Sequence, residues 1–326
     1  MDERSLVGLV DIGGTKIRVG IGQQARLLKA VSVATDSSAG ADAVIWRVAQ
    51  TLSRLVEELG FQESDISRIG LAVPGPLDQS QGIVRYAGIL QWIDYPVAQR
   101  LSTALQGIPV RIDDDANLAA LGEAHYGAGA AYGDQWFITV STGIGGSMII
   151  EGQVYQGAQG FAGEIGHTSV MSDGPPCICG NRGCLEAVAS GTAIASLGNE
   201  LGLRGESRIL AELVDQGVIV TAEHVAKAAT RGDPSCIDVF REAADYLGLA
   251  LANVINLCSP EILILGGGVI YGYPPMLEQV VEQVESRILA VYQNKLPIKM
   301  GILGQDAGLW GAYHMISRSA VDDLTT

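Results

Sequence analysis

The chain has 326 residues, 48% of them hydrophobic and 17% charged, a composition typical of globular rather than disordered proteins. At roughly 100–200 residues per domain, this length predicts two domains. The net charge of −15 disfavours binding to nucleic acid, because a phosphate backbone would be repelled by that field.

The first part of the chain alternates predicted strands and helices. Apolar runs predict strands, in chain order, over residues 6–11, 17–21, 69–73 and 110–112. Apolar residues at helical spacing predict helices over residues 41–59, 97–105 and 116–126. This order indicates an α/β layer arrangement.

The second part repeats the opening unit. Leu9-Val-Asp-Ile-Gly-Gly-Thr15 and Val140-Ser-Thr-Gly-Ile-Gly-Gly146 both have the pattern strand, glycine-rich turn, strand, which indicates an internal duplication. Further strands are expected over residues 136–140, 148–150, 262–265 and 298–302, and helices over much of 190–260, 275–292 and 307–317. We expect a small domain of residues 1–115 plus about 306–326, and a large domain of residues 116–305.

No membrane or export segment is expected. The start of the sequence lacks a signal-peptide pattern, and Asn, Pro and Glu residues interrupt the longest apolar stretch, around residues 246–270. The sequence therefore predicts a cytoplasmic protein with no membrane partner.

Three glycine-rich turns follow predicted strands. Without a Cβ atom, glycine lets backbone N–H groups converge on an anion. A single turn of this kind is more often a simple hairpin, but three of them, two in matching halves, favour a nucleotide phosphate site between the domains. The candidate residues are Asp11, Gly13, Gly14, Thr15 and Lys16, then Thr142, Gly143, Gly145 and Gly146, then Gly266, Gly267 and Gly268.

A metal site is predicted near residue 180. Cys177, Cys179 and Cys184 offer three thiolates within eight residues, and His167 precedes them. Three Cys and one His complete a tetrahedral zinc site with no open position, so its role would be structural. The alternative is that these are three ordinary buried cysteines.

Carboxylates surround this predicted metal site. A metal that holds His167 and Cys184 would also fix Glu164 and Glu186, and such a pocket suits a ligand with several hydroxyl groups. The alternative is two solvated surface glutamates, although the flanking glycines and apolar residues favour partial burial. Asp115 follows a predicted strand, where it is equally consistent with a helix N-cap and with a general base.

Together these motifs resemble the ROK family of bacterial sugar kinases, repressors and related proteins. The sharpest part is Gly163-Glu-Ile-Gly-His167 followed by Cys177-x-Cys-Gly-x-x-Gly-Cys184-x-Glu186. The resemblance implies an α/β actin-like ATPase fold, with two duplicated RNase H-like domains around a nucleotide cleft. It implies glucokinase-like phosphorylation of a hexose hydroxyl by ATP, with Mg²⁺ at the phosphates and a structural Zn²⁺. It also implies a homodimer or homotetramer.

The same resemblance implies the role of each site residue. Asp115 would be the catalytic base, and Asp114, Glu164, His167 and Glu186 would bind the sugar. The zinc ligands would be His167, Cys177, Cys179 and Cys184.

Two departures from the family pattern leave the acceptor open. Asp114 and Gly88 stand where the family usually has Asn, and both Asn would be expected to contact the sugar. An N-acetylhexosamine such as GlcNAc or ManNAc, fructose, another hexose or a cyclitol-type polyol are therefore alternatives to glucose. A non-catalytic sugar-binding protein is a further alternative. A DNA-binding repressor is disfavoured, because only ten residues precede Asp11 and the charge is −15.

Overall fold

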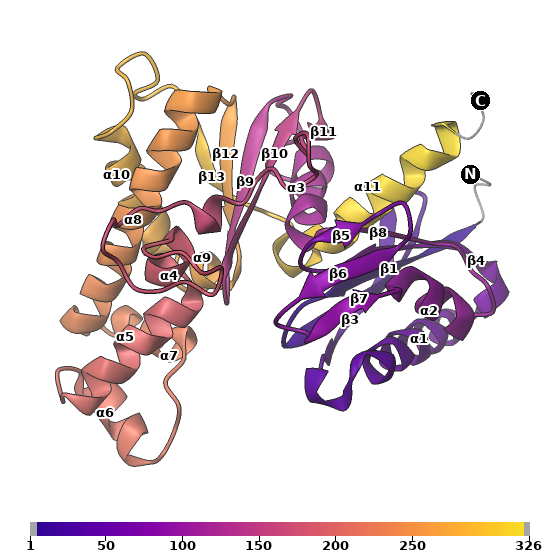
Figure 1. Cartoon of the computed structure of the whole chain (residues 1–326), viewed down its shortest axis with the longest axis horizontal. Coiled ribbons are helices and arrows are strands. Elements are labelled where there is room, and N and C mark those ends of the chain that lie inside the picture. Colours follow the sequence, from indigo (N-terminus) through magenta and orange to yellow (C-terminus); the bar gives the residue numbers. More distant parts are fainter. Residues whose placement is uncertain (1–4, 323–326) are drawn as a thin grey trace. The chain divides into compact units, whose positions relative to one another are not determined.

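A computed structural model describes residues 5–322 and divides them into two compact units. The first unit contains the residues up to 130, the segment 152–154 and the residues from 305 onward, and the second unit contains residues 131–151 and 155–304. In Figure 1 the first unit runs from indigo to purple and is completed by the yellow helix α11.

The first unit is built on a five-stranded sheet. Its strand order is β3-β2-β1-β4-β8, with β1, β2 and β3 antiparallel and with β4 and β8 parallel to β1. The carboxyl ends of β1, β4 and β8 therefore lie at one edge, the usual ligand edge of an α/β sheet. The strands are β1 (Leu6–Ile12), β2 (Lys16–Gln23), β3 (Arg26–Ala34), β4 (Ile66–Ala72) and β8 (Val110–Asp113).

Four α-helices accompany this sheet: α1 (Ala41–Glu58), α2 (Val97–Ala104), α3 (Asp115–Tyr126) and α11 (Ala307–Asp322). Helix α11 packs closely on its neighbours, because a Cβ atom at Gly311 would collide with the Leu118 carbonyl of α3. A Cβ atom at Gly70 of β4 would likewise lie 2.7 Å from the Ala312 carbonyl oxygen of α11. This packing groups residues 116–130 with the first unit, whereas the sequence placed the domain boundary directly after Asp115.

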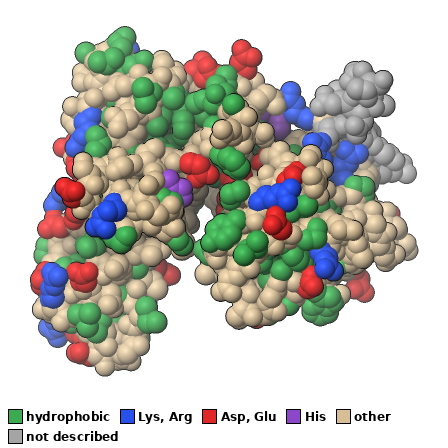
Figure 2. Space-filling model, in the orientation of Figure 1, with side chains coloured by type: hydrophobic (Ala, Val, Ile, Leu, Met, Phe, Trp, Pro, Cys, Tyr) green, Lys and Arg blue, Asp and Glu red, His purple; other side chains and the backbone are tan. Residues whose placement is uncertain are grey.

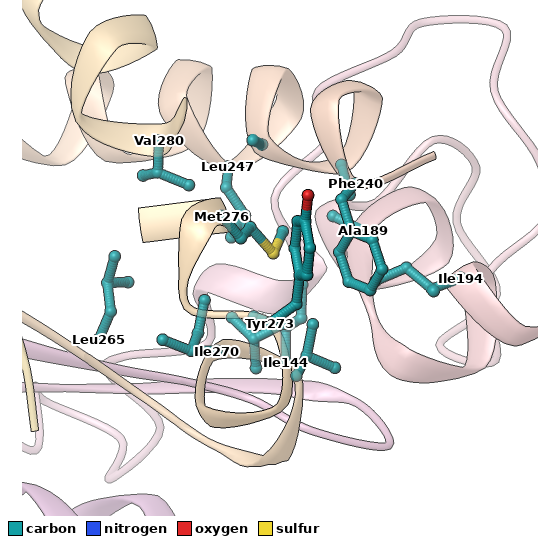
Figure 3. Packing of buried hydrophobic residues seen from close by; sticks show 14 of the residues in the cluster. Ile144, Ala189, Ile194, Phe240, Leu247, Leu265, Ile270, Tyr273, Met276 and Val280 are labelled. Carbon is teal, nitrogen blue, oxygen red and sulfur yellow. The ribbon is translucent and has the colours of Figure 1, made fainter. Parts of the chain in front are cut away.

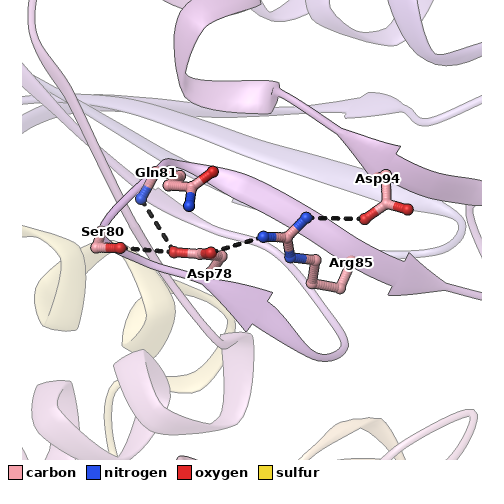
Figure 4. Close-up of polar contacts among 5 residues, drawn as sticks. All are labelled: Asp78, Ser80, Gln81, Arg85 and Asp94. Atoms are coloured by element: carbon pink, nitrogen blue, oxygen red, sulfur yellow. Dashed lines mark hydrogen bonds and ion pairs between the residues drawn. The ribbon is translucent and has the colours of Figure 1, made fainter.

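A small antiparallel sheet is inserted between β4 and α2. It consists of β5 (Leu77–Asp78), β6 (Ile83–Ala87) and β7 (Trp92–Tyr95), none of which the sequence predicted. Figure 4 shows the polar contacts on this sheet, where Arg85 donates to Asp78 at 2.7 Å and to Asp94 at 3.0 Å. These exposed ion pairs connect the three short strands.

The second unit repeats the first. Its sheet order, β11-β10-β9-β12-β13, corresponds position by position to that of the first sheet, with β9 and β10 antiparallel and with β12 and β13 parallel to β9. The strands are β9 (Gln135–Val140), β10 (Ile144–Ile150), β12 (Ile262–Gly266) and β13 (Ile298–Met300), with the two-residue strand β11 (Gln153–Val154) at the edge of the sheet. Strand β11 lies in the short segment 152–154 that is grouped with the first unit. The matching order confirms the predicted duplication.

Helices enclose the main core of the second unit. They are α4 (Leu185–Ala189), α5 (Gly191–Leu203), α6 (Arg208–Asp215), α7 (Ala222–Thr230), α8 (Pro234–Cys258), α9 (Gly268–Gly272) and α10 (Pro275–Glu285). Figure 3 shows this core, in which the rings of Tyr273 and Phe240 stack with centroids 4.3 Å apart and Met276 lies beside them.

Two observations bear on partners. Within residues 5–322, none of the helices combines the length and the apolar character that crossing a bilayer requires. On the face drawn in Figure 2, Lys and Arg side chains lie in small separate groups, with Asp and Glu side chains near them.

Candidate functional site

The predicted site residues fall on both units, and each half is described by itself. In the first unit the glycine-rich turn joins β1 to β2. The Gly13 N–H donates to the Lys16 carbonyl at 2.9 Å and closes the turn, while Thr15 and Lys16 are exposed. A Cβ atom at Gly14 would collide with the side chain of Ile89. A side chain at position 14 would therefore have to displace the exposed side chain of Ile89.

The Asp11 carboxylate lies beside this turn, at the end of β1. It packs against Gly308 of α11, where a Cβ atom would collide with the Asp11 carboxylate. Burial and the nearby negative charge of Asp114 raise the pKa of Asp11 to about 7. A carboxyl group with such a pKa is ready to respond to a cation, since a nearby positive charge favours its ionised form.

Asp113 is a buried structural acid at the end of β8. Its Oδ1 accepts hydrogen bonds from Gln79 Nε2 at 2.7 Å, from the Asp114 N–H at 2.7 Å and from Asn117 Nδ2 at 3.1 Å. Burial raises its pKa, and these hydrogen bonds oppose that rise. Asp113 thus joins the inserted small sheet to the start of α3.

Asp114, not Asp115, is the N-cap of α3. Its carboxylate accepts from the backbone N–H groups of Ala116 at 3.0 Å and Asn117 at 3.3 Å, whereas Asp115 is the first helical residue. The interpretation of Asp115 as the cap is therefore wrong by one residue. Asp115 remains at the carboxyl edge of the sheet, half-buried, with its Oδ1 2.9 Å from the Ala116 nitrogen.

In the second unit the two predicted glycine turns lie next to each other. The Gly268 N–H donates to the Ser141 hydroxyl at 3.4 Å, directly before the turn of residues 142–146. Gly267 has φ of 93°, and a Cβ atom there would collide with the Val140 carbonyl. The structure therefore brings these glycines together at the ends of β9 and β12.

Glu186 belongs to the same face as the turn of residues 142–146. Its Oε2 accepts from the Ile144 N–H at 3.0 Å, and a Cβ atom at Gly143 would collide with this carboxylate. Glu186 is half-buried, as expected, whereas Glu164 is exposed, so the expectation of burial is wrong for Glu164. The flanking Gly163 and Gly166 bury their backbones against β10 and leave the Glu164 side chain in solvent.

The four predicted metal ligands come together. One donor atom from each of His167, Cys177, Cys179 and Cys184 lies within 4.8 Å of all the others. Sγ of Cys179 and Sγ of Cys184 are 3.6 Å apart, and Sγ of Cys177 lies 3.7 Å from Nδ1 of His167. Two ligands of a tetrahedral zinc ion with Zn–S bonds of about 2.3 Å are separated by about 3.7 Å. The donor set and its spacing thus fit zinc.

Sequence reasoning missed Gln79, Asn117 and Ile89. Gln79 and Asn117 hold Asp113, and Ile89 packs on Gly14. Asn117 could have been found from the sequence, because it lies four residues after Asp113, in the first turn of the predicted helix. Gln79 has no marked residue beside it in the sequence, whereas Ile89 directly follows Gly88, one of the two departures from the family pattern.

The comparisons with known proteins agree with this geometry. The ROK family model matches residues 7–319. A glucokinase of Halalkalibacterium halodurans is 33% identical over 320 residues, which are 98% of this chain and 96% of that protein. A xylose repressor of Caldicellulosiruptor bescii is 33% identical over 250 residues, covering 76% of this chain and 62% of the repressor.

A solved structure extends the similarity to three dimensions. The ROK family glucokinase of Streptomyces griseus, determined with glucose and AMPPNP, is 31% identical with a TM-score of 0.84 and covers 95% of this chain and 99% of its own. This likeness confirms the predicted actin-like ATPase fold. With a family match over nearly its whole length and a full-length relative at 33% identity, the chain belongs to the ROK family.

Proposed function

We propose that this chain is an ATP-dependent sugar kinase that phosphorylates a hydroxyl group of a hexose-type sugar. The enzyme class is supported by glucokinase relatives that match almost end to end and by a related structure with an ATP analogue. The observation that carries the proposal is the first unit's carboxyl edge, where a glycine turn and Asp115 follow parallel strands of one sheet.

Asp115 is the proposed general base. It takes the proton of the attacking sugar hydroxyl while that oxygen bonds to the γ-phosphorus and the bond to the ADP oxygen breaks. Asp114 caps α3, and Asp115 lies beside it at the carboxyl edge of the sheet, with one carboxylate oxygen 2.9 Å from the Ala116 nitrogen. Asp114 and Asp115 lie at the start of α3, and in-line transfer needs such fixed placement of the base.

The glycine turns are the proposed phosphate and nucleotide contacts. These are Gly13 to Lys16 in the first unit, together with the turns at Thr142–Gly146 and Gly266–Gly268 in the second. Mg²⁺ would neutralise phosphate charge during transfer, with Asp11 as its expected protein partner. The pKa of about 7 for Asp11 supports this role, since an adjacent divalent cation would favour the ionised carboxylate.

Zinc would hold the substrate side of the second unit. A closed site of three thiolates and one imidazole contributes to folding and has no open position for chemistry. It would fix the segment that carries Glu164, His167 and Glu186, the proposed ligands of sugar hydroxyls.

The acceptor sugar stays a proposal at the level of a hexose. Ionised Asp114 can only accept hydrogen bonds, whereas the amide of Asn could also donate. Gly88 offers no side chain, and a Cβ atom there would lie 2.9 Å from the hydroxyl oxygen of Tyr86. Glucose is the first candidate because of the relatives, and N-acetylhexosamines, fructose and cyclitols are alternatives. A cytoplasmic location and a homodimer or homotetramer remain expectations.

The test is ADP release from Mg-ATP with a panel of acceptors: glucose, mannose, fructose, allose, N-acetylglucosamine, N-acetylmannosamine and myo-inositol. Turnover with one sugar, lowered about 10²- to 10⁴-fold in Asp115→Asn, is the expected result. If zinc-loaded, folded protein bound these sugars but turned over none, the non-catalytic sugar-binding alternative would replace the kinase proposal.

A further inference from the structure

A buried threonine, Thr35, forms hydrogen bonds to the glycine-rich turn of residues 13–16, the proposed phosphate contact of the first unit. Thr35 follows β3, and no part of it is exposed. Its hydroxyl donates to the Gly13 carbonyl at 2.6 Å, and its backbone N–H donates to the Thr15 carbonyl at 3.0 Å. One residue thus binds two carbonyl groups of the turn that joins β1 to β2.

Helix α1 fixes Thr35 in turn. The Arg47 guanidinium donates to the Thr35 carbonyl and, at 3.2 Å, to the Ala34 carbonyl. Arg47 also lies 3.5 Å from the Asp36 carboxylate. The end of β3 is therefore clamped to α1, and Thr35 transmits that constraint to the turn.

The hydroxyl bond decides which way one peptide plane faces. In a trans peptide the C=O of one residue and the N–H of the next point in opposite directions. Drawing the Gly13 carbonyl toward buried Thr35 therefore turns the Gly14 N–H away from the interior. Among the residues that the structure describes, no acceptor takes the Gly14 N–H. If this peptide were turned the other way, the Gly13 carbonyl would take the position of the Gly14 N–H and would repel an anion.

We propose that Thr35 is a positioning residue for phosphoryl transfer, whose hydroxyl orients the Gly13–Gly14 peptide so that the Gly14 N–H can donate to a phosphate of the nucleotide. This inference rests on the proposed kinase function and adds a residue to it. Thr35 acts through the turn and does not itself touch the nucleotide.

The matched variants are Thr35→Val, which removes the hydroxyl at nearly constant volume, and Thr35→Ser, which keeps it. Thr51→Val is the control, because Thr51 is also a buried threonine with one hydroxyl bond, 2.7 Å to the Arg47 carbonyl within α1. If Thr35→Val does not fold, Thr35→Ala removes the same hydroxyl with less demand for space.

Two measurements make up the test. Calorimetric titration with Mg-AMPPNP gives the nucleotide Kd without an acceptor, and steady-state kinetics separate kcat/KM for ATP from KM for the sugar. We expect Thr35→Val to weaken nucleotide binding and kcat/KM for ATP about tenfold, the loss of one hydrogen bond of ordinary strength. Thr35→Ser should stay within about threefold of wild type, and KM for the sugar should hardly change.

The outcomes separate the two proposals. If Thr35→Val binds nucleotide as well as Thr51→Val does, or if Thr35→Ser fails to restore binding, the role of Thr35 is refuted while the kinase proposal stands. An equal weakening of kcat/KM for ATP and of KM for the sugar would also refute the role of Thr35, because it would indicate general disruption of the protein. If folded wild-type protein binds no nucleotide, the kinase proposal itself fails.

Discussion

A stacked pair of histidines in the first unit should make this protein sensitive to acid. His125 of α3 and His314 of α11 lie with ring centroids 3.6 Å apart and planes 7° from parallel. Burial, together with the neighbouring His125 and Arg318, lowers the pKa of His314 from 6.5 to about 4. Burial also lowers the pKa of His125.

The sign and size of the effect follow from these values. Between pH 6.5 and 4, His314 is protonated in the unfolded chain but neutral in the folded protein. The free energy of unfolding therefore decreases as the pH falls. From pH 7.5 to 5.0 only the interval below 6.5 counts, and at about 1.36 kcal/mol per unit this gives at most about 2 kcal/mol. Because the ring is partly exposed, we expect about half of that, roughly 1 kcal/mol.

The assay compares wild type with His314→Phe. Phe keeps an aromatic ring in the stack, and it breaks no hydrogen bond at the His314 Nε2, which is buried without a partner in the described residues. Urea unfolding at pH 7.5 and 5.0, above the sequence pI of about 4.6, can be followed by tryptophan fluorescence. Three of the four tryptophans, Trp46, Trp92 and Trp310, report on the first unit. Wild type should lose about 1 kcal/mol more than the variant, and equal losses would refute the reasoning.

Three further predictions concern the site. Asp115→Asn should lower kcat about 10²- to 10⁴-fold without changing the circular dichroism spectrum, and near-normal turnover would remove Asp115 as the base. Cys179→Ser should reduce the zinc content from about one per chain and lower the melting temperature, and elemental analysis that finds no zinc in the wild type would defeat the metal assignment. Gly88→Asn should displace the Tyr86 hydroxyl and change the order of preferred sugars while KM for ATP stays constant; an unaltered sugar profile would show that position 88 does not contact the acceptor.

Features that are local in the sequence were predictable. The glycine turns and the Cys/His cluster depend on spacing within a few residues, and the structure places each of them as a unit. The family and the fold follow from these same motifs and are confirmed. The roles of individual site residues stay predictions, since no bound ligand tests them.

Features that depend on distant segments were not predictable. Thr35 and Gly13 are 22 positions apart in the sequence, and a single threonine after a strand does not predict such a hydrogen bond. The strands β5 and β7 are too short for a periodic signal to develop, with two and four residues. The cap of α3 was misplaced because three consecutive aspartates offer equivalent side chains, and only the backbone dihedral angles select Asp114.

The packing of α11 constrains the order in which a chain leaving the ribosome can fold. The second unit is nearly continuous in sequence, so its helices and sheet can assemble once residue 304 has emerged. Most of the first unit is synthesised earlier, but β4 and α3 lack their packing partner until Gly311 and Ala312 of α11 have been synthesised. Until then its apolar sheet surface is exposed to chaperones and to aggregation. The half of the enzyme translated first is thus the half completed last.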